Sequence, residues 1–128
     1  MLLNRGMEPN GSLLMPATVD LMRQNHIGDL TILRQVGVDP GVSQPFPINA
    51  GVDNFGLGFQ VAASQVSDPD LRAEGSYSWS GLQNTHFWVD PVRGIGAVIL
   101  MQQLPFYDDQ VMELVENFEV LVNRTLAD

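Results

Sequence analysis

The chain has 128 residues and a net charge of −9, with 15 acidic residues against six arginines and no lysine. The length suits one small domain with its own core, and no apolar run approaches the roughly 18 residues of a membrane span. The arginines are scattered, which argues against nucleic acid and anionic lipid as partners, because both require clustered cations. The absence of cysteine excludes disulfides and thiolate zinc sites.

The first part of the chain, residues 1–54, is predicted to hold short helices and a long loop. Residues 1–6 resemble the last turn of a helix that Gly6 would end in a left-handed conformation. Residues 16–24 predict a short helix, because Pro16 suits a first helical turn and apolar residues follow on one face. Proline and glycine then interrupt any periodic pattern in residues 28–54, which predicts a loop.

Three strands are predicted within residues 55–104, over 55–62, 78–90 and 95–102. The first alternates glycine with bulky apolar residues, and the other two are apolar on both faces. The connections between them are short, which favours an antiparallel meander.

Residues 108–126 predict the longest helix, with Asp108 or Asp109 as its N-cap. Apolar residues recur there at helical spacing, and acidic residues, Glu119 among them, occupy the other face, which we expect to be merely solvated. The prediction for residues 1–128 is therefore a single α+β domain, in which this helix packs on a three-stranded antiparallel meander behind short N-terminal helices.

Several motifs in this order resemble the C-terminal part of the class C β-lactamase-like serine hydrolases, in the branch of esterases and penicillin-binding proteins whose third motif is Trp-x-Gly. The motifs are Leu14-Met15-Pro16-Ala17-Thr18-Val19, Phe55-Gly56-Leu57-Gly58-Phe59, Trp79-Ser80-Gly81, Phe87-Trp88-Val89-Asp90-Pro91, Gly94-Ile95-Gly96 and Gln103-Leu104-Pro105. The resemblance covers most of the chain.

The resemblance implies that Trp79, Ser80 and Gly81 border an active-site cleft and contact substrate. In the family, a backbone N–H just after the motif glycine helps to bind the oxyanion of acyl transfer, and this position corresponds to Leu82. Trp79 would form an apolar wall, Ser80 would hydrogen-bond a substrate carbonyl or carboxylate, and Gly81 would let the acyl group approach the backbone. The substrate would be an ester or a β-lactam-like small molecule.

The family nucleophile is missing from the chain. It is the serine of a Ser-x-x-Lys motif, and this sequence contains no lysine. The second family motif, Tyr-x-Asn or Tyr-x-Ser, matches neither Tyr77 nor Tyr107. We therefore expect a C-terminal portion of a larger hydrolase, which supplies the oxyanion-hole strand but is inactive alone.

Other catalytic sets are weaker. Ser80, His86 and Asp90 could form a triad on paper, but on one continuous strand the α-carbons of Ser80 and His86 would lie roughly 20 Å apart. His26 and His86 have no spacing that indicates a metal site, and nothing in the sequence indicates a cofactor. His86 is more simply a half-buried strand residue.

The strand at 95–102 is predicted to have an open edge, because in the family two strands from the N-terminal end pair with it. An open apolar edge favours self-association or pairing with the missing part. The alternative function is a non-catalytic interaction module that binds itself, a peptide or a ligand through this edge. The N-terminus carries only Arg5 and lacks the apolar segment of a signal peptide, which favours a cytoplasmic location.

Overall fold

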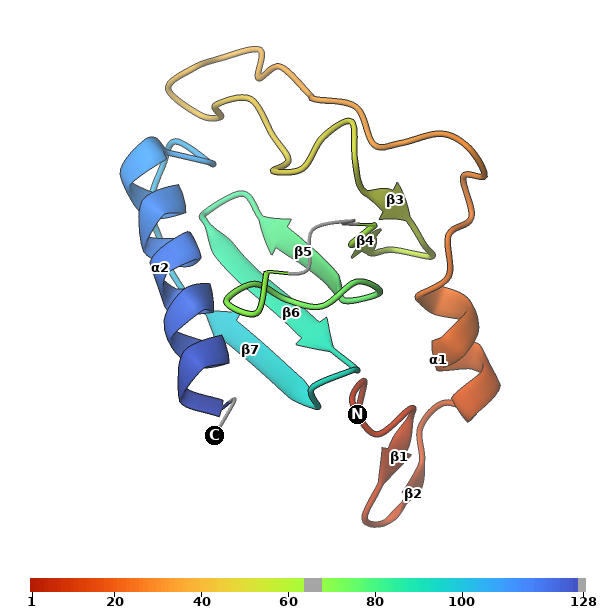
Figure 1. Ribbon diagram of the computed structural model, residues 1–128. Helices are drawn as coiled ribbons and strands as arrows, with labels where there is room; N and C mark the ends of the chain where they lie inside the picture. Colours follow the sequence, from red (N-terminus) through yellow and green to blue (C-terminus); the bar gives the residue numbers. More distant parts are fainter. Residues whose placement is uncertain (64–67, 127–128) are drawn as a thin grey trace.

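The computed structural model describes residues 1–63 and 68–126. Residues 64–67, inside the predicted strand region, lie outside the described part. The described elements, shown in Figure 1, are β1 (Met7–Glu8), β2 (Gly11–Ser12), α1 (Pro16–Met22), β3 (Asn54–Phe55), β4 (Gln60–Val61), β5 (Tyr77–Gly81), β6 (Thr85–Asp90), β7 (Ile95–Ile99) and α2 (Asp109–Leu126).

The main sheet has five antiparallel strands in the order β3-β4-β5-β6-β7, so each strand pairs with its neighbours in the sequence. The prediction of an antiparallel meander is confirmed, but the prediction of three strands is wrong. Two of the three predicted strands are each folded into a hairpin. Residues 55–62 reverse direction in a turn that includes Gly58 at a φ of 89°, and residues 78–90 reverse direction between Gly81 and Thr85.

The N-terminal residues do not end a helix, which corrects the prediction for residues 1–6. They form turns in which the N–H groups of Arg5 and Gly6 donate to the carbonyls of Leu2 and Met1. Gly6 does adopt a left-handed conformation, with a φ of 87°, and it leads into the small β1-β2 hairpin. The prediction of a left-handed Gly6 is confirmed, but the apolar residues Leu2 and Leu3 before it lie in a turn and not in a helix.

The segment between α1 and β3 contains no helix or strand, as the sequence predicts for residues 28–54. Figure 1 shows it as a long arc, in orange and yellow, that leaves α1 and returns to β3. Two isolated bridges hold it, Gln35 with Phe46 and Ser43 with Phe106. The second bridge joins the loop to the segment that follows β7.

The two faces of the sheet are covered by different parts of the chain. On one face, Trp88 is almost fully buried and meets Phe118 of α2 edge-on, with ring centroids 5.6 Å apart. On the other face, Val61, Tyr77 and Val89 form a core cluster, against which Leu2 and Phe59 pack. Because directly paired residues of neighbouring strands share a face, the register assigns every side chain of β5 and β6 to one of these two layers.

Helix α2 follows the prediction closely. The carboxylate of Asp108 accepts hydrogen bonds from the N–H groups of Gln110 and Val111, at 3.1 and 3.3 Å, so Asp108 is the N-cap. Val111 and Val115 are buried, and acidic residues such as Glu113 and Glu116 are exposed. Neither α1 nor α2 combines the length and the apolar character that a membrane-crossing helix needs, within residues 1–63 and 68–126.

Candidate functional site

The Trp79-Ser80-Gly81 motif lies at the end of β5, directly opposite β6. Its residues pair with Phe87, His86 and Thr85 respectively. Residues opposite each other in an antiparallel pair have α-carbons about 5 Å apart. The predicted separation of roughly 20 Å between Ser80 and His86 is therefore wrong, because the two residues lie on neighbouring strands and not on one.

The proximity of Ser80 and His86 does not assemble a triad. The Nε2 atom of His86 is buried and has no hydrogen-bond partner among the described residues. The carboxylate of Asp90 accepts from the N–H groups of Ala73, Val92 and Arg93 and from the Arg93 guanidinium, all within 2.9–3.0 Å. Asp90 is thus fully engaged in holding two turns together, and it does not orient His86.

Trp79 and Gly81 lie on the sheet face opposite α2. Trp79 is 41% exposed, and its ring meets Phe55 edge-on at 5.4 Å between centroids. A Cβ atom added at Gly81 would meet nothing closer than Thr85, at an ordinary 3.9 Å. Packing within the chain therefore does not require glycine at position 81, which leaves room for another molecule to approach the strand.

Leu82 follows in the tight turn between β5 and β6. The turn is closed by the N–H of Asn84, which donates to the carbonyl of Gly81 at 2.9 Å. The N–H of Leu82 donates to no acceptor in residues 1–63 or 68–126, and its side chain is exposed. A backbone donor without an acceptor thus directly follows an exposed glycine, and the role of Leu82 as an oxyanion donor stays a prediction.

Ser80 points the other way, toward α2. It lines a cavity of about 790 Å³, which lies between the sheet, α2 and the loop before β3. Tyr107 lines the same cavity, and burial raises the pKa of its hydroxyl, although hydrogen bonds with the Ile48 N–H and the Ser80 hydroxyl act in the opposite direction. The predicted contact between Ser80 and substrate stays a prediction.

His86 is buried beside Tyr107, with 5.6 Å between the ring centroids. Burial lowers the pKa of His86 to about 4, and the positive charge of Arg72 adds to the shift. His86 is therefore neutral at pH 7. A neutral imidazole could act as a base, but its Nε2 has no hydrogen-bond partner among the described residues, and the ring lies beside Phe106 and Tyr107.

The sequence did not indicate the polar contacts that surround this cavity. Glu119 of α2 is buried and pairs with Arg72, accepting from its backbone N–H and its Nε at 2.8 Å. The Arg72 guanidinium also lies 5.0 Å from the centre of the Trp88 ring. We expected the acidic face of α2 to be merely solvated. For Glu119 this is wrong, and a two-faced pattern alone could not identify a partner 47 residues away.

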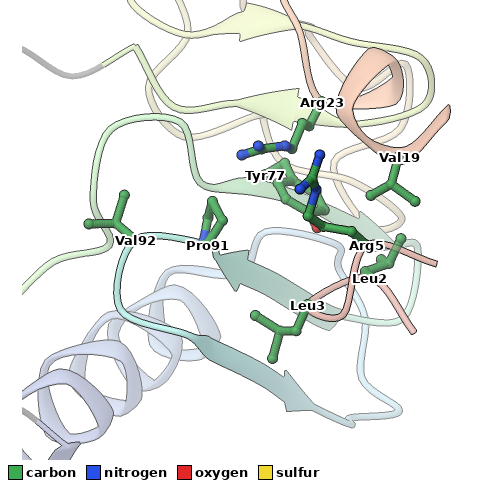
Figure 2. A pocket seen from close by; sticks show the side chains of 8 residues that line it. All are labelled: Leu2, Leu3, Arg5, Val19, Arg23, Tyr77, Pro91 and Val92. Carbon is green, nitrogen blue, oxygen red and sulfur yellow. The ribbon is translucent and has the colours of Figure 1, made fainter. Parts of the chain in front are cut away.

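A second cavity, of about 200 Å³, lies near the opposite end of β5, against the N-terminal segment. Figure 2 shows Arg5 and Arg23 on either side of Tyr77, with Leu2 and Leu3 below them. Both guanidinium groups pair with Asp20 of α1. This cavity is thus the place where α1 and the N-terminus dock on the sheet, and the one carboxylate that pairs with both of its arginines is that of Asp20.

A metal site is not evident in residues 1–63 and 68–126, where His, Asp and Glu side chains form no group of three that could hold an ion. His26 instead contacts backbone, since its Nε2 lies 2.7 Å from the carbonyl of Leu21.

Comparison with known proteins supports the family resemblance that the motifs indicate. One fungal relative, the monacolin J acid methylbutanoyltransferase of Aspergillus terreus, is 27% identical over 114 residues, which is 86% of this chain and 28% of the relative. The ML-236A carboxylate methylbutanoyltransferase mlcH of Penicillium citrinum is 27% identical over 122 residues, covering 91% of this chain and 29% of the relative.

The fold matches solved structures of the same kind. The unliganded simvastatin synthase LovD from Aspergillus terreus superposes with a TM-score of 0.70 at 25% identity, covering 97% of this chain and 32% of that chain. The chain thus spans less than a third of the length of the relatives it matches. The family described as Beta-lactamase matches residues 19–120, which is most of the chain. The chain belongs to the beta-lactamase family.

Proposed function

We propose that this chain supplies the oxyanion-hole strand and one cleft wall of a β-lactamase-family serine hydrolase or acyltransferase, and that it lacks the nucleophile of the reaction. The observation that carries the proposal is the pair formed by Gly81, where an added Cβ would meet only Thr85 at 3.9 Å, and Leu82, whose N–H donates to no acceptor among the described residues. Trp79, half exposed on the same face, supplies the apolar wall beside them.

The rest of the reaction would come from elsewhere in a longer polypeptide. A Ser-x-x-Lys motif requires lysine, and this chain has none. Two relatives carry names that describe methylbutanoyl transfer, which favours the transfer of a short acyl group from an ester or thioester. A β-lactam-like substrate remains the second substrate class to test.

The first test is the activity of the purified chain toward p-nitrophenyl acetate and a chromogenic cephalosporin. We expect no turnover above buffer. Turnover that disappears in the variants Trp79→Ala and Leu82→Pro would contradict the proposal, because it would mean that the chain holds its own nucleophile.

The second test uses a chimera in which this chain forms part of a full-length acyltransferase. The matched segment of the Aspergillus terreus methylbutanoyltransferase is replaced by this chain, since by the family pattern the remaining part carries the Ser-x-x-Lys motif. We expect the folded chimera to hydrolyse p-nitrophenyl acetate, and Leu82→Pro to lower kcat at least a hundredfold, because the variant lacks one oxyanion donor. A folded, active chimera that is indifferent to Leu82→Pro would refute the role of this strand.

A second candidate function is favoured by the outer edge of β7. Among the described residues this strand pairs only with β6, and Val98 and Leu100 are 59% and 76% exposed. Residues 95–100 carry no charge and no proline that would block an additional strand. We propose that this edge pairs with a strand of the remaining polypeptide or, in its absence, with a second copy of the chain.

Sedimentation tests this pairing. At tens of micromolar we expect a dimer, and Val98→Lys should return the chain to a monomer, because a charged side chain on an edge strand opposes pairing. Val92→Lys, in the exposed turn before β7, is the matched control. A natural chain that remains monomeric at this concentration would contradict self-association.

A further inference from the structure

The turn that carries Leu82 has a specific backbone shape. Three residues separate the paired Gly81 and Thr85, and the last of them, Asn84, has a φ of 60°. A hydrogen-bonded turn followed by one left-handed residue is the common form of a three-residue hairpin loop. Asparagine tolerates this left-handed conformation better than most residues do. The backbone of Asn84 therefore fixes how the turn closes.

The side chain of Asn84 forms hydrogen bonds with a different segment, residues 103–107. It is fully buried, and its amide group donates to the carbonyls of Gln103 and Pro105, at 3.1 and 2.9 Å. Its amide oxygen accepts from the N–H of Tyr107 at 2.8 Å. An asparagine side chain can make about four hydrogen bonds, so most of its capacity serves one segment. We refer to these three contacts as the Asn84 clamp.

The segment held by the clamp is itself well anchored. The N–H of Phe106 donates to Val42, and the carbonyl of Phe106 accepts from Gln44, both at 2.8 Å. The ring of Phe106 lies 5.1 Å from that of Phe46. The Asn84 clamp therefore connects an exposed turn to a segment that the long loop before β3 also holds.

We infer that Asn84 is a positioning residue, which holds the N–H of Leu82 in a fixed direction by tying its turn to residues 103–107. The inference rests on the proposed function for its meaning, because an oxyanion donor is effective only if it is already oriented when charge develops. The side chain of Leu82 is exposed and purely aliphatic, so it cannot fix the turn itself. Asn84 does not itself face the cleft, since it is buried behind the turn.

The variant Asn84→Gly separates the side chain from the backbone, because glycine accepts the left-handed conformation but cannot form the clamp. Gln83→Ala is the matched control. Its exposed side chain lies in the same turn, and the substitution keeps the Gln83 carbonyl, which accepts from the Gln103 N–H at 3.4 Å. Both variants are made in the full chain and labelled with ¹⁵N for relaxation and hydrogen-exchange measurements.

In the natural chain we expect the amide of Leu82 to have an order parameter of about 0.85, and in Asn84→Gly about 0.6. The Tyr107 amide should exchange at least tenfold faster in Asn84→Gly. Gln83→Ala should change neither quantity, and the amides of Trp88 and Val89 in β6 should stay as they were in both variants. A Leu82 amide that is as rigid in Asn84→Gly as in the natural chain would overturn the inference.

If Asn84→Gly does not fold, Asn84→Asp provides the same test. The carboxylate keeps the acceptor for Tyr107, but it faces the carbonyls of Gln103 and Pro105 without a donor. We expect the Leu82 amide to become mobile at pH 7 and to recover rigidity on acidification, because a protonated carboxyl can donate one of the lost bonds. Rigidity that does not respond to pH or to the substitution would refute the inference.

The chimera distinguishes this inference from the proposed function. If both hold, Asn84→Gly lowers kcat at least tenfold and leaves KM unchanged. If Leu82 becomes mobile while kcat is unchanged, Asn84 still orients the turn, but Leu82 is not the oxyanion donor and the proposed function fails. If Leu82→Pro abolishes turnover while Asn84→Gly leaves both Leu82 rigidity and kcat unchanged, the strand has its proposed role and the inference about Asn84 fails.

Discussion

The two ends of β6 are closed in the same way by chemically different side chains. Asn84 precedes the strand and Asp90 ends it, and both are fully buried. Each holds a segment distant in sequence, residues 103–107 at one end and residues near Ala73 at the other. Asn84 does so as a neutral amide, whereas Asp90 does so as a carboxylate with a charged partner, Arg93. The comparison teaches that the side chain that closes the end beside the proposed site does not titrate, whereas the one that closes the far end depends on its charge.

Removing the carboxylate of Asp90 should have the largest effect on stability. Asp90→Ala leaves the N–H groups of Ala73, Val92 and Arg93 and the Arg93 guanidinium without their acceptor, and we expect a loss of about 3–5 kcal/mol in the free energy of unfolding. Urea denaturation followed by tryptophan fluorescence measures it. Asp90→Asn, which keeps one oxygen acceptor, should lose less. A loss below about 1 kcal/mol for Asp90→Ala would show that these contacts are not needed to hold the turn.

As the pH is lowered, the first group of β6 to respond should be His86, the second residue of the strand. The pKa of His86 is lowered to about 4, so the fold favours the neutral imidazole. The unfolded chain, with a pKa near 6.5, takes up this proton first, and stability is therefore complete above about pH 6.5 and falls as the pH is lowered toward 4. The loss should reach about 3 kcal/mol. His86→Phe should remove the pH dependence of the urea midpoint in this window.

The Asp90 end should respond at lower pH. Burial raises the pKa of Asp90, but the N–H groups of Ala73 and Arg93 outweigh burial and lower it overall. Its contribution is therefore present above the ordinary carboxylate pKa and is lost only as the pH falls through the lowered value. Asp90→Asn should flatten the stability curve below about pH 4 and leave the His86 window unchanged. If Asp90→Asn changed the stability curve only between about pH 4 and pH 6.5, where His86 titrates, the assignment to Asp90 would be wrong.

Substitution of Asn84 should lower the free energy of unfolding less than substitution of Asp90 does. Asn84→Ala loses three hydrogen bonds and places a less tolerant residue at a φ of 60°, and we expect a loss of about 2–3 kcal/mol. Asn84→Gly, which avoids the backbone strain, should lose about 1 kcal/mol less. Urea midpoints of the two variants give the difference. Equal midpoints would mean that the left-handed conformation carries no strain.

The smallest effect on stability is expected at Gly81. An added Cβ meets only Thr85 at 3.9 Å, so Gly81→Ala should change the free energy of unfolding by less than about 1 kcal/mol in either direction. In the chimera the same substitution should lower turnover, because the methyl group occupies the approach to the strand. A large loss of stability would instead make Gly81 a structural glycine.

The sequence predicted the elements that a periodic pattern defines. The apolar spacing of Val111 and Val115 and the cap at Asp108 are local features, and α2 forms where they indicate. The site motif was also found from local residues. Its surroundings were not, because the partners of Asn84 lie 19 to 23 residues away along the chain and Arg72 lies 47 residues from Glu119.

The main error was the continuous strand over residues 78–90. Apolar residues fill both halves of the hairpin, so the pattern continues through the turn. The turn sequence Gly81-Leu82-Gln83-Asn84 lacks the Asn-Gly or Asp-Gly pair that most clearly marks a hairpin. Asn84 was the available signal, since asparagine often takes the left-handed conformation. Splitting the strand there would have paired Ser80 with His86 correctly.

The sequential order of the strands has a consequence for how the chain folds. Because β5 pairs with β6 and β6 pairs with β7, each with the next strand along the chain, forming these pairs closes only short loops and carries a small entropic cost. Topologies of low contact order fold quickly. In a longer polypeptide this meander would therefore form before any pairing between segments that are distant in the sequence.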